Sequence, residues 1–80
     1  MIINFVRDNV LINTDNMVRM YTGLTGGGPN DPDRKYIAFR LMVNEYDYKH
    51  VFWKVEDYNV AMSKIRDAFK KRKRYIEIDG

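Results

Sequence analysis

The spacing of apolar residues changes once along this chain, at Glu56 and Asp57, and this change limits the folds available to it. Before this point apolar residues tend to alternate, as in β-strands, and after it they recur every three or four residues, as on one side of a helix. The helical stripe consists of Tyr58, Ala61, Met62, Ile65, Ala68 and Phe69. We therefore expect a helix over about 58–71, with Asp57 as its N-cap.

The part of the chain before the helix holds five stretches rich in strand-favouring residues, namely 2–7, 10–13, 17–22, 35–44 and 50–55. Asp8 and Asn9 separate the first two stretches and tolerate the positive φ of a two-residue hairpin turn. The cross-strand pairs in that hairpin are Phe5 with Ile12 and Val6 with Leu11.

Alternation assigns the faces of the last two predicted strands. In the fourth strand the core face is expected to hold Ile37, Phe39, Leu41 and Val43, and the opposite face Tyr36, Ala38, Arg40 and Met42. A polar turn over 45–49 leads to the fifth strand, where Val51, Trp53 and Val55 share one face, and His50, Phe52 and Lys54 share the other.

This order of elements predicts an α+β fold in one domain spanning residues 1–80. The expected architecture is an antiparallel β-meander of about five strands with one C-terminal amphipathic helix packed on it. Residues 74–79 could add a short last strand, but no glycine or proline separates them from the helix, so this point stays open.

Residues 23–34 hold four of the five glycines and both prolines, which predicts a loop. The loop lacks the Gly-Lys-Ser/Thr of a phosphate-binding loop, and no helix follows it. Asp31 and Asp33 lack the closing glutamate of a calcium loop. We therefore expect no cofactor and no metal.

Catalytic residue types are scarce in this sequence. The chain has one histidine, His50, one serine, Ser63, and no cysteine. A serine–histidine pair needs a third orienting group, and none is evident, so both residues are predicted to be unconnected surface residues. We expect a protein that is not an enzyme and that takes no small-molecule substrate.

The positive charge is concentrated in one run, Lys70–Arg74. The whole chain has a net charge of +3, whereas the nine basic and eleven acidic residues outside this run give −2. Two interpretations remain open. The run is a solvated helix end matched to the helix dipole, or it is a contact for phosphates or an acidic partner.

The sequence gives no sign of a membrane or secretory segment. No apolar stretch approaches the roughly 20 residues of a membrane span, and the first residues do not resemble a signal peptide. The absence of cysteine fits a reducing compartment. These observations predict a cytoplasmic protein with no membrane contact.

Two segments resemble the small flagellar FlbD-like proteins. Residues 12–17, INTDNM, are similar to the Ile-Asn-x-Asp-x-Ile segment of that family, and residues 56–65, EDYNVAMSKI, to its final helix. The matching positions are Ile12, Asn13, Asp15, Glu56, Ala61, Met62, Lys64 and Ile65. The first strand, the 23–34 loop and the basic tail depart from the family. The resemblance implies a small non-enzymatic bacterial or phage accessory protein and carries over no catalytic residue.

The leading functional hypothesis is a non-catalytic interaction module that binds a protein partner or forms a homodimer. This hypothesis rests on the apolar character of the sheet face opposite the core. The expected contacts on that face are Tyr36, Met42 and Phe52. The alternative is nucleic-acid binding, with aromatic residues of the sheet for stacking and a basic run formed by Lys70, Lys71, Arg72, Lys73 and Arg74.

Overall fold

The computed structural model of the chain describes residues 1–42 and 47–80. The predicted Val43 of the core face and residues 45 and 46 of the predicted 45–49 turn lie outside the described residues. Tyr48 and Lys49 were predicted for that turn, but they already belong to the next strand. The elements, in order, are β1 (Ile2–Phe5), β2 (Val10–Asn13), a 3₁₀ turn η1 (Thr14–Asn16), β3 (Met17–Leu24), β4 (Lys35–Leu41), β5 (Tyr48–Val51), α1 (Val55–Lys70) and β6 (Tyr75–Ile78).

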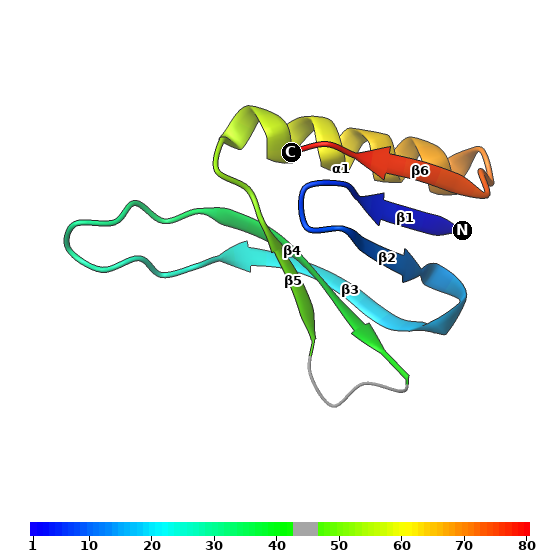
Figure 1. Ribbon diagram of the computed structural model, residues 1–80, viewed down its shortest axis with the longest axis horizontal. Helices are drawn as coiled ribbons and strands as arrows, with labels where there is room; N and C mark the ends of the chain where they lie inside the picture. The colour runs from blue at the N-terminus through cyan, green and yellow to red at the C-terminus, as the bar shows by residue number, and fades with distance from the viewer. Residues whose placement is uncertain (43–46) are drawn as a thin grey trace.

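The strands form two three-stranded sheets, one in the order β2-β1-β6 and the other in the order β3-β4-β5. All neighbouring strands are antiparallel except β1 and β6, which are parallel. Figure 1 shows α1 lying along β6, with the β3-β4-β5 sheet crossing below. The α+β class, the C-terminal helix and the last strand are thus confirmed.

The prediction of a single meander was wrong, because the first hairpin and the next three strands form separate sheets. The last strand has a specific place in this arrangement. It pairs with the edge of β1 that β2 leaves unpaired, and so satisfies the main-chain groups of that edge.

The core lies between the two sheets and the apolar stripe of α1. It is contributed by Ile3, Phe5, Ile12, Ile37, Phe39, Phe52, Ala61, Met62, Ile65, Ala68, Ile76 and Ile78. In β6 the alternation is strict, because Ile76 and Ile78 are buried and Tyr75 and Glu77 are exposed. The helix stripe was predicted correctly at its four central positions, while Tyr58 packs at the margin and Phe69 is 43% exposed.

The register of the first hairpin differs from the prediction by two residues. Phe5 faces Val10, and Ile3 faces Ile12. The strand ends at Phe5, and a four-residue connection follows, closed by a hydrogen bond from the Asn9 N–H to the Val6 carbonyl at 3.2 Å. Only Asn9 in this turn takes a positive φ, of 53°. The turn therefore begins earlier than the Asp8-Asn9 pair suggested.

The prediction that Phe52 lies on the sheet face available to a partner was wrong. Phe52 is 1% exposed and lies in the core, whereas Trp53 is 68% exposed. His50 and Phe52 share one face, as predicted, and this face packs on the core. The strand ends at Val51, and Val55 already begins the helix. The Trp53 ring instead lies under the Arg34 guanidinium, with 4.4 Å from Cζ to the ring centroid.

The helix begins three residues earlier than predicted, at Val55. Its N-cap is Lys54, whose side chain makes no capping hydrogen bond, so the predicted Asp57 cap was wrong. Asp57 and Glu56 lie in the first turn instead, where a carboxylate interacts favourably with the positive end of the helix dipole.

The predicted loop becomes the tip of the long β3–β4 hairpin, which extends away from the rest of the molecule (Figure 1). The Thr25 N–H continues the ladder to the Arg34 carbonyl at 2.9 Å, and Asp33 Oδ1 accepts from the Gly27 N–H at 2.6 Å. Within the described residues, no helix is long and apolar enough to cross a membrane.

Candidate functional site

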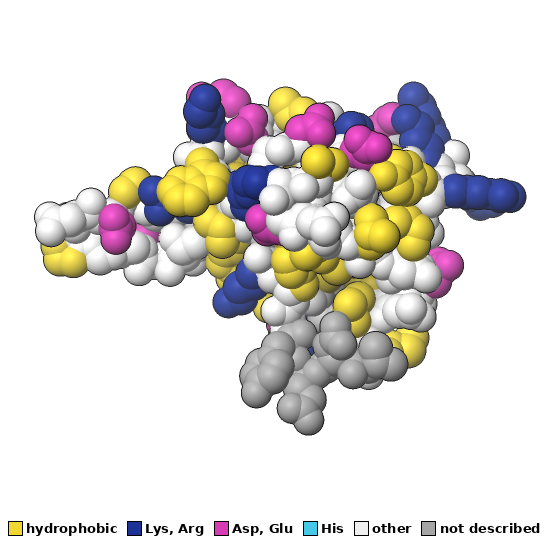
Figure 2. Space-filling model, in the orientation of Figure 1, with side chains coloured by type: hydrophobic (Ala, Val, Ile, Leu, Met, Phe, Trp, Pro, Cys, Tyr) yellow, Lys and Arg dark blue, Asp and Glu magenta, His cyan; other side chains and the backbone are white. Residues whose placement is uncertain are grey.

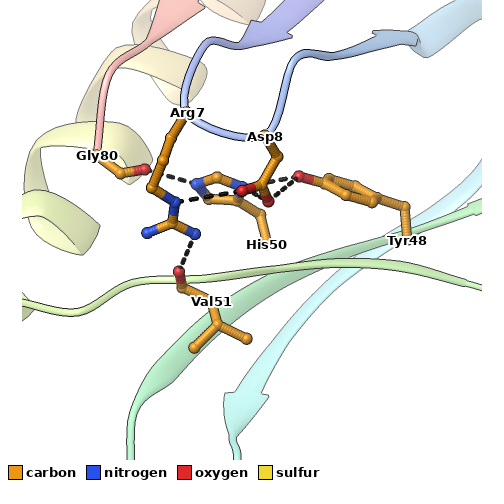
Figure 3. Close-up of polar contacts among 6 residues, drawn as sticks. All are labelled: Arg7, Asp8, Tyr48, His50, Val51 and Gly80. Atoms are coloured by element: carbon orange, nitrogen blue, oxygen red, sulfur yellow. Dashed lines mark hydrogen bonds and ion pairs between the residues drawn. The ribbon is translucent and has the colours of Figure 1, made fainter.

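The buried side chain of His50 is at the centre of a polar cluster (Figure 3). Its Nδ1 lies 2.7 Å from the Tyr48 hydroxyl and 3.1 Å from Asp8 Oδ2, and its Nε2 lies 2.6 Å from the main-chain oxygen of Gly80. The ring packs on Phe5, with 4.4 Å between ring centroids. One side chain thus connects the β1–β2 turn, β5 and the segment that follows β6.

The protonation of this cluster follows from its donors and acceptors. Nε2 must carry a hydrogen to donate to Gly80, and Tyr48 donates to Asp8 at 3.0 Å. Only a protonated ring could also donate from Nδ1 to Asp8. Burial nevertheless lowers the pKa of His50, and the Gly80 oxygen and the Asp8 carboxylate oppose this effect without cancelling it.

The pKa of the Asp8 carboxyl group changes for different reasons. Partial burial alone would raise its pKa, but hydrogen bonds from Tyr48 and Arg7 and the charges of His50 and Arg7 lower it overall. Arg7 also donates to the Val51 carbonyl, which fastens the turn to β5. The hydroxyl pKa of Tyr48 is raised, first by burial and then by its bond to Asp8.

The prediction that His50 is a surface residue was therefore wrong, because its side chain is 0% exposed. Ser63 is exposed on α1 and makes no contact with it. A ring closed off from solvent cannot meet a substrate, so the cluster holds the fold together. In the described part of the chain, no group of three or more His, Cys, Asp or Glu residues could hold a metal ion.

The outer face of the β3-β4-β5 sheet is accessible and carries aromatic and positively charged side chains together. Cross-strand register places five side chains together there, and we call this set the tyrosine–cation face: Arg19, Tyr21, Tyr36, Arg40 and Lys49. Ala38 lies among them and is 0% exposed, because the larger side chains cover it. The prediction that Tyr36, Ala38 and Arg40 share the face opposite the core agrees with this register.

The two tyrosine rings of this face have a defined geometry. Their centroids are 6.3 Å apart, and the rings are nearly perpendicular at 86°. Tyr36 lies across Gly23, its partner on β3, where an added Cβ would be only 2.5 Å from the Tyr36 hydroxyl oxygen. Glycine at this position therefore lets the ring lie down on the sheet.

Cations accompany both rings. The guanidinium carbon of Arg19 is 4.7 Å from the Tyr21 centroid, and Lys49 Nζ is 5.0 Å from the Tyr36 centroid. Such contacts hold long side chains beside the aromatic surface. The face therefore presents aromatic rings and positive charges at neighbouring positions.

The carboxylate of Asp47 holds two side chains of the tyrosine–cation face in place. Asp47 accepts from the Tyr21 hydroxyl and from Arg40 Nε, the latter at 2.8 Å. These two bonds, first that of Tyr21 and then that of Arg40, lower the pKa of Asp47, and the same carboxylate raises the pKa of Tyr21. Arg40 is thus partly neutralised, and Arg19 and Lys49 carry most of the net positive charge.

The basic run surrounds the end of α1 and does not form one surface. Arg72 takes a left-handed conformation, with φ 54°, and the Lys73 N–H bonds to the Ala68 carbonyl, which closes the helix as a Schellman motif. Asp67 pairs with Lys71 at 3.3 Å and with Lys73 at 3.8 Å. Figure 2 shows Lys and Arg side chains projecting in different directions at this end of the molecule.

The sequence-predicted contact residues are therefore divided among four places. Tyr36 lies on the outer sheet face, Met42 is 66% exposed just beyond β4, and Phe52 is buried and unavailable to a partner. Residues 70–74 are at the far end of α1. Arg19 and Lys49 were missed. The sequence shows that Arg19 shares a strand face with Tyr21, and Lys49 with Val51. Only the pairing of the strands places Arg19 and Lys49 beside Tyr36.

No protein-family model, curated protein or solved structure matches this chain. The geometry of its own residues therefore carries the functional argument.

Proposed function

We propose that this chain is a non-catalytic binding module that holds single-stranded nucleic acid on the tyrosine–cation face. The observation that supports this proposal is the pairing of two tyrosine rings on this face with cations, Tyr21 with Arg19 on β3 and Tyr36 on β4 with Lys49 on β5. Bases stack on aromatic and guanidinium surfaces, and phosphates bind nearby cations. Stacking tolerates any base, so the module would show little sequence preference.

The run Lys70–Arg74 is the other candidate for phosphate contact, and its geometry supports it less. Two of its lysines already pair with Asp67, and its side chains diverge around the helix end, where Phe69 is 43% exposed. Its cations near the last carbonyls of α1 interact favourably with the helix dipole.

Salt dependence tests the proposal. Binding of a fluorescent single-stranded oligonucleotide should weaken with salt at a log–log slope of roughly −1.4 to −2, as expected for two or three phosphates. The double variant Arg19→Gln/Lys49→Gln should lose most of this slope. Tyr36→Ala should cost about 1–3 kcal/mol of binding free energy through lost stacking.

The matched control is the triple variant Lys70→Gln/Lys71→Gln/Lys73→Gln, which removes more charge at the other end of the molecule. It should keep the wild-type slope. If the triple variant loses the slope and the double variant keeps it, the site is the helix end. Undetectable binding of the wild-type protein at about 50 mM salt would contradict both nucleic-acid hypotheses.

A second candidate function is self-association through apolar residues at the start of β3. Val18 is 59% exposed at a bulge in β3, and Met42 is 66% exposed. The Met42 N–H bonds to the Asn16 carbonyl at 3.0 Å, which brings the two side chains into the same region. Neighbouring exposed apolar side chains favour association between proteins.

Sedimentation tests this candidate. A homodimer at micromolar concentration should dissociate when Met42 is replaced by glutamate, because a charge would then be buried at the contact. Leu24→Glu, at a similarly exposed position (57%) on the hairpin arm, is the control and should leave the dimer intact. A monomeric wild-type protein would remove the candidate.

A further inference from the structure

The unpaired edge of β6 lies beside a groove that neither function above uses. The groove runs between α1 and β6, with a volume of about 220 Å³. Its floor is formed by Ala61 and Ile78, each 2% exposed, and Val60, 66% exposed, lies on its helix side. Figure 2 shows acidic side chains over α1 and β6 on the face toward the viewer.

The main chain of β6 presents N–H and C=O groups at this edge. The Ile2 N–H bonds to the Arg74 carbonyl, and the Val6 N–H bonds to the Ile78 carbonyl. With the parallel register, these bonds direct the main-chain groups of Ile76 and Ile78 toward β1. Those of Tyr75 and Glu77 therefore point outward, because β6 is the last strand of its sheet.

The charges around the edge favour one kind of occupant. Asp57, Glu77 and Asp79 line the groove against a single lysine, Lys64, although the whole protein carries a net charge of +3. Two copies of β6 paired edge to edge would bring like charges together, which disfavours self-pairing. A segment with lysine or arginine would instead be attracted.

We propose that the β6 edge binds an extended, basic segment of a partner protein as an added strand. The segment would pair with the outward main-chain groups of β6, as peptides do at other open sheet edges. Alternate side chains would face opposite ways. One set, basic, would lie beside Glu77 and Asp79, and the other, apolar, would lie over Val60 and the groove floor.

The end of the edge is held in place by two contacts of Gly80. Gly80 packs on Asp57 at the start of α1, where an added Cβ would be 2.6 Å from the Asp57 Cβ. Its main-chain oxygen accepts from His50. The groove is therefore pre-formed, and binding requires little reordering of the protein.

A synthetic peptide, acetyl-Lys-Val-Lys-Val-Lys-Val-amide, serves as the probe. It should bind in calorimetry, and Glu77→Lys should weaken binding about tenfold, because attraction becomes repulsion across the new strand pair. Glu56→Lys makes the same charge change on an exposed helix residue outside the groove and should leave binding unchanged. Equal weakening by both variants would show charge attraction without a site and overturn the proposal.

Amide hydrogen exchange tests strand pairing directly. The peptide should slow exchange at Tyr75 and Glu77, whose N–H groups point outward, and a peptide with proline for its central valine should not. No binding of the basic peptide, or equal binding of its proline version, would overturn the proposal. So would a dimer that protects these amides without peptide, because the occupant would then be a second copy.

Discussion

Replacing His50 with alanine is expected to lower the free energy of unfolding by about 3–4 kcal/mol, since it leaves a cavity and removes hydrogen bonds inside the protein. The ring is fully buried against Phe5 and Phe52, with centroid distances of 4.4 Å and 4.8 Å. Its loss would leave the Gly80 oxygen without this donor. Urea denaturation at neutral pH measures the change.

The control for this experiment is Tyr48→Phe, which keeps the ring and removes only a hydroxyl. It should cost about 1 kcal/mol, the usual net value of one hydrogen bond. If His50→Ala costs no more than Tyr48→Phe, the cluster does not hold the fold together as described.

The pH profile of stability gives an independent readout of the same prediction. Because burial lowers the folded-state pKa of His50, the unfolded chain binds the proton first as pH falls. Stability should decline as pH drops through the ordinary value of 6.5, and the loss is complete below the folded-state pKa. His50→Ala should lack this decline. Asp8, whose pKa is lowered from 3.8, acts in a separate and more acidic window.

Replacing Phe5 with alanine is expected to cost about 3–5 kcal/mol, the range for a buried phenylalanine. Phe5 is 0% exposed and touches aromatic residues of the other sheet, with ring centroids 5.6 Å from Phe39 and 5.5 Å from Tyr48. A domain of this size has modest stability, so the variant should be largely unfolded at about 37 °C.

Thermal denaturation followed by circular dichroism measures this loss. The neighbouring Val6→Ala is the control, because Val6 is 44% exposed and should cost less than about 1 kcal/mol. A Phe5→Ala protein that melts near the wild-type temperature would mean that the two sheets do not pack through this ring.

The helix and the buried alternation of β4 could be predicted because their signals are local. Residues 58–69 repeat at helical spacing, and Ile37 and Phe39 alternate along one strand. The hairpin register could not be predicted in the same way, since the residue that begins the turn, Val6, is itself a good strand former. Phe52 was misplaced because the face that it shares with His50, opposite Ile37, is the one that packs on the core.

The candidate sites depend on contacts between segments that are distant in sequence. His50 meets Asp8 and Gly80 across 42 and 30 residues, and no spacing rule links those positions. Tyr36 was predicted for the outer face, but its companions Arg19 and Lys49 come from strands on either side of it. The basic run Lys70–Arg74 is the opposite case. Its five residues are consecutive in sequence, but their side chains are spread around the helix end.

The parallel pairing of β1 with β6 bears on how fast and in what order the chain can fold. It brings Ile2 beside Tyr75, so the β2-β1-β6 sheet closes a loop of about 70 residues, and loops of that length close slowly. During synthesis on a ribosome, β1 would leave the exit tunnel long before β6 exists. The edge of β1 would stay open through that interval, and a chaperone that covers it would limit misassociation of the nascent chain.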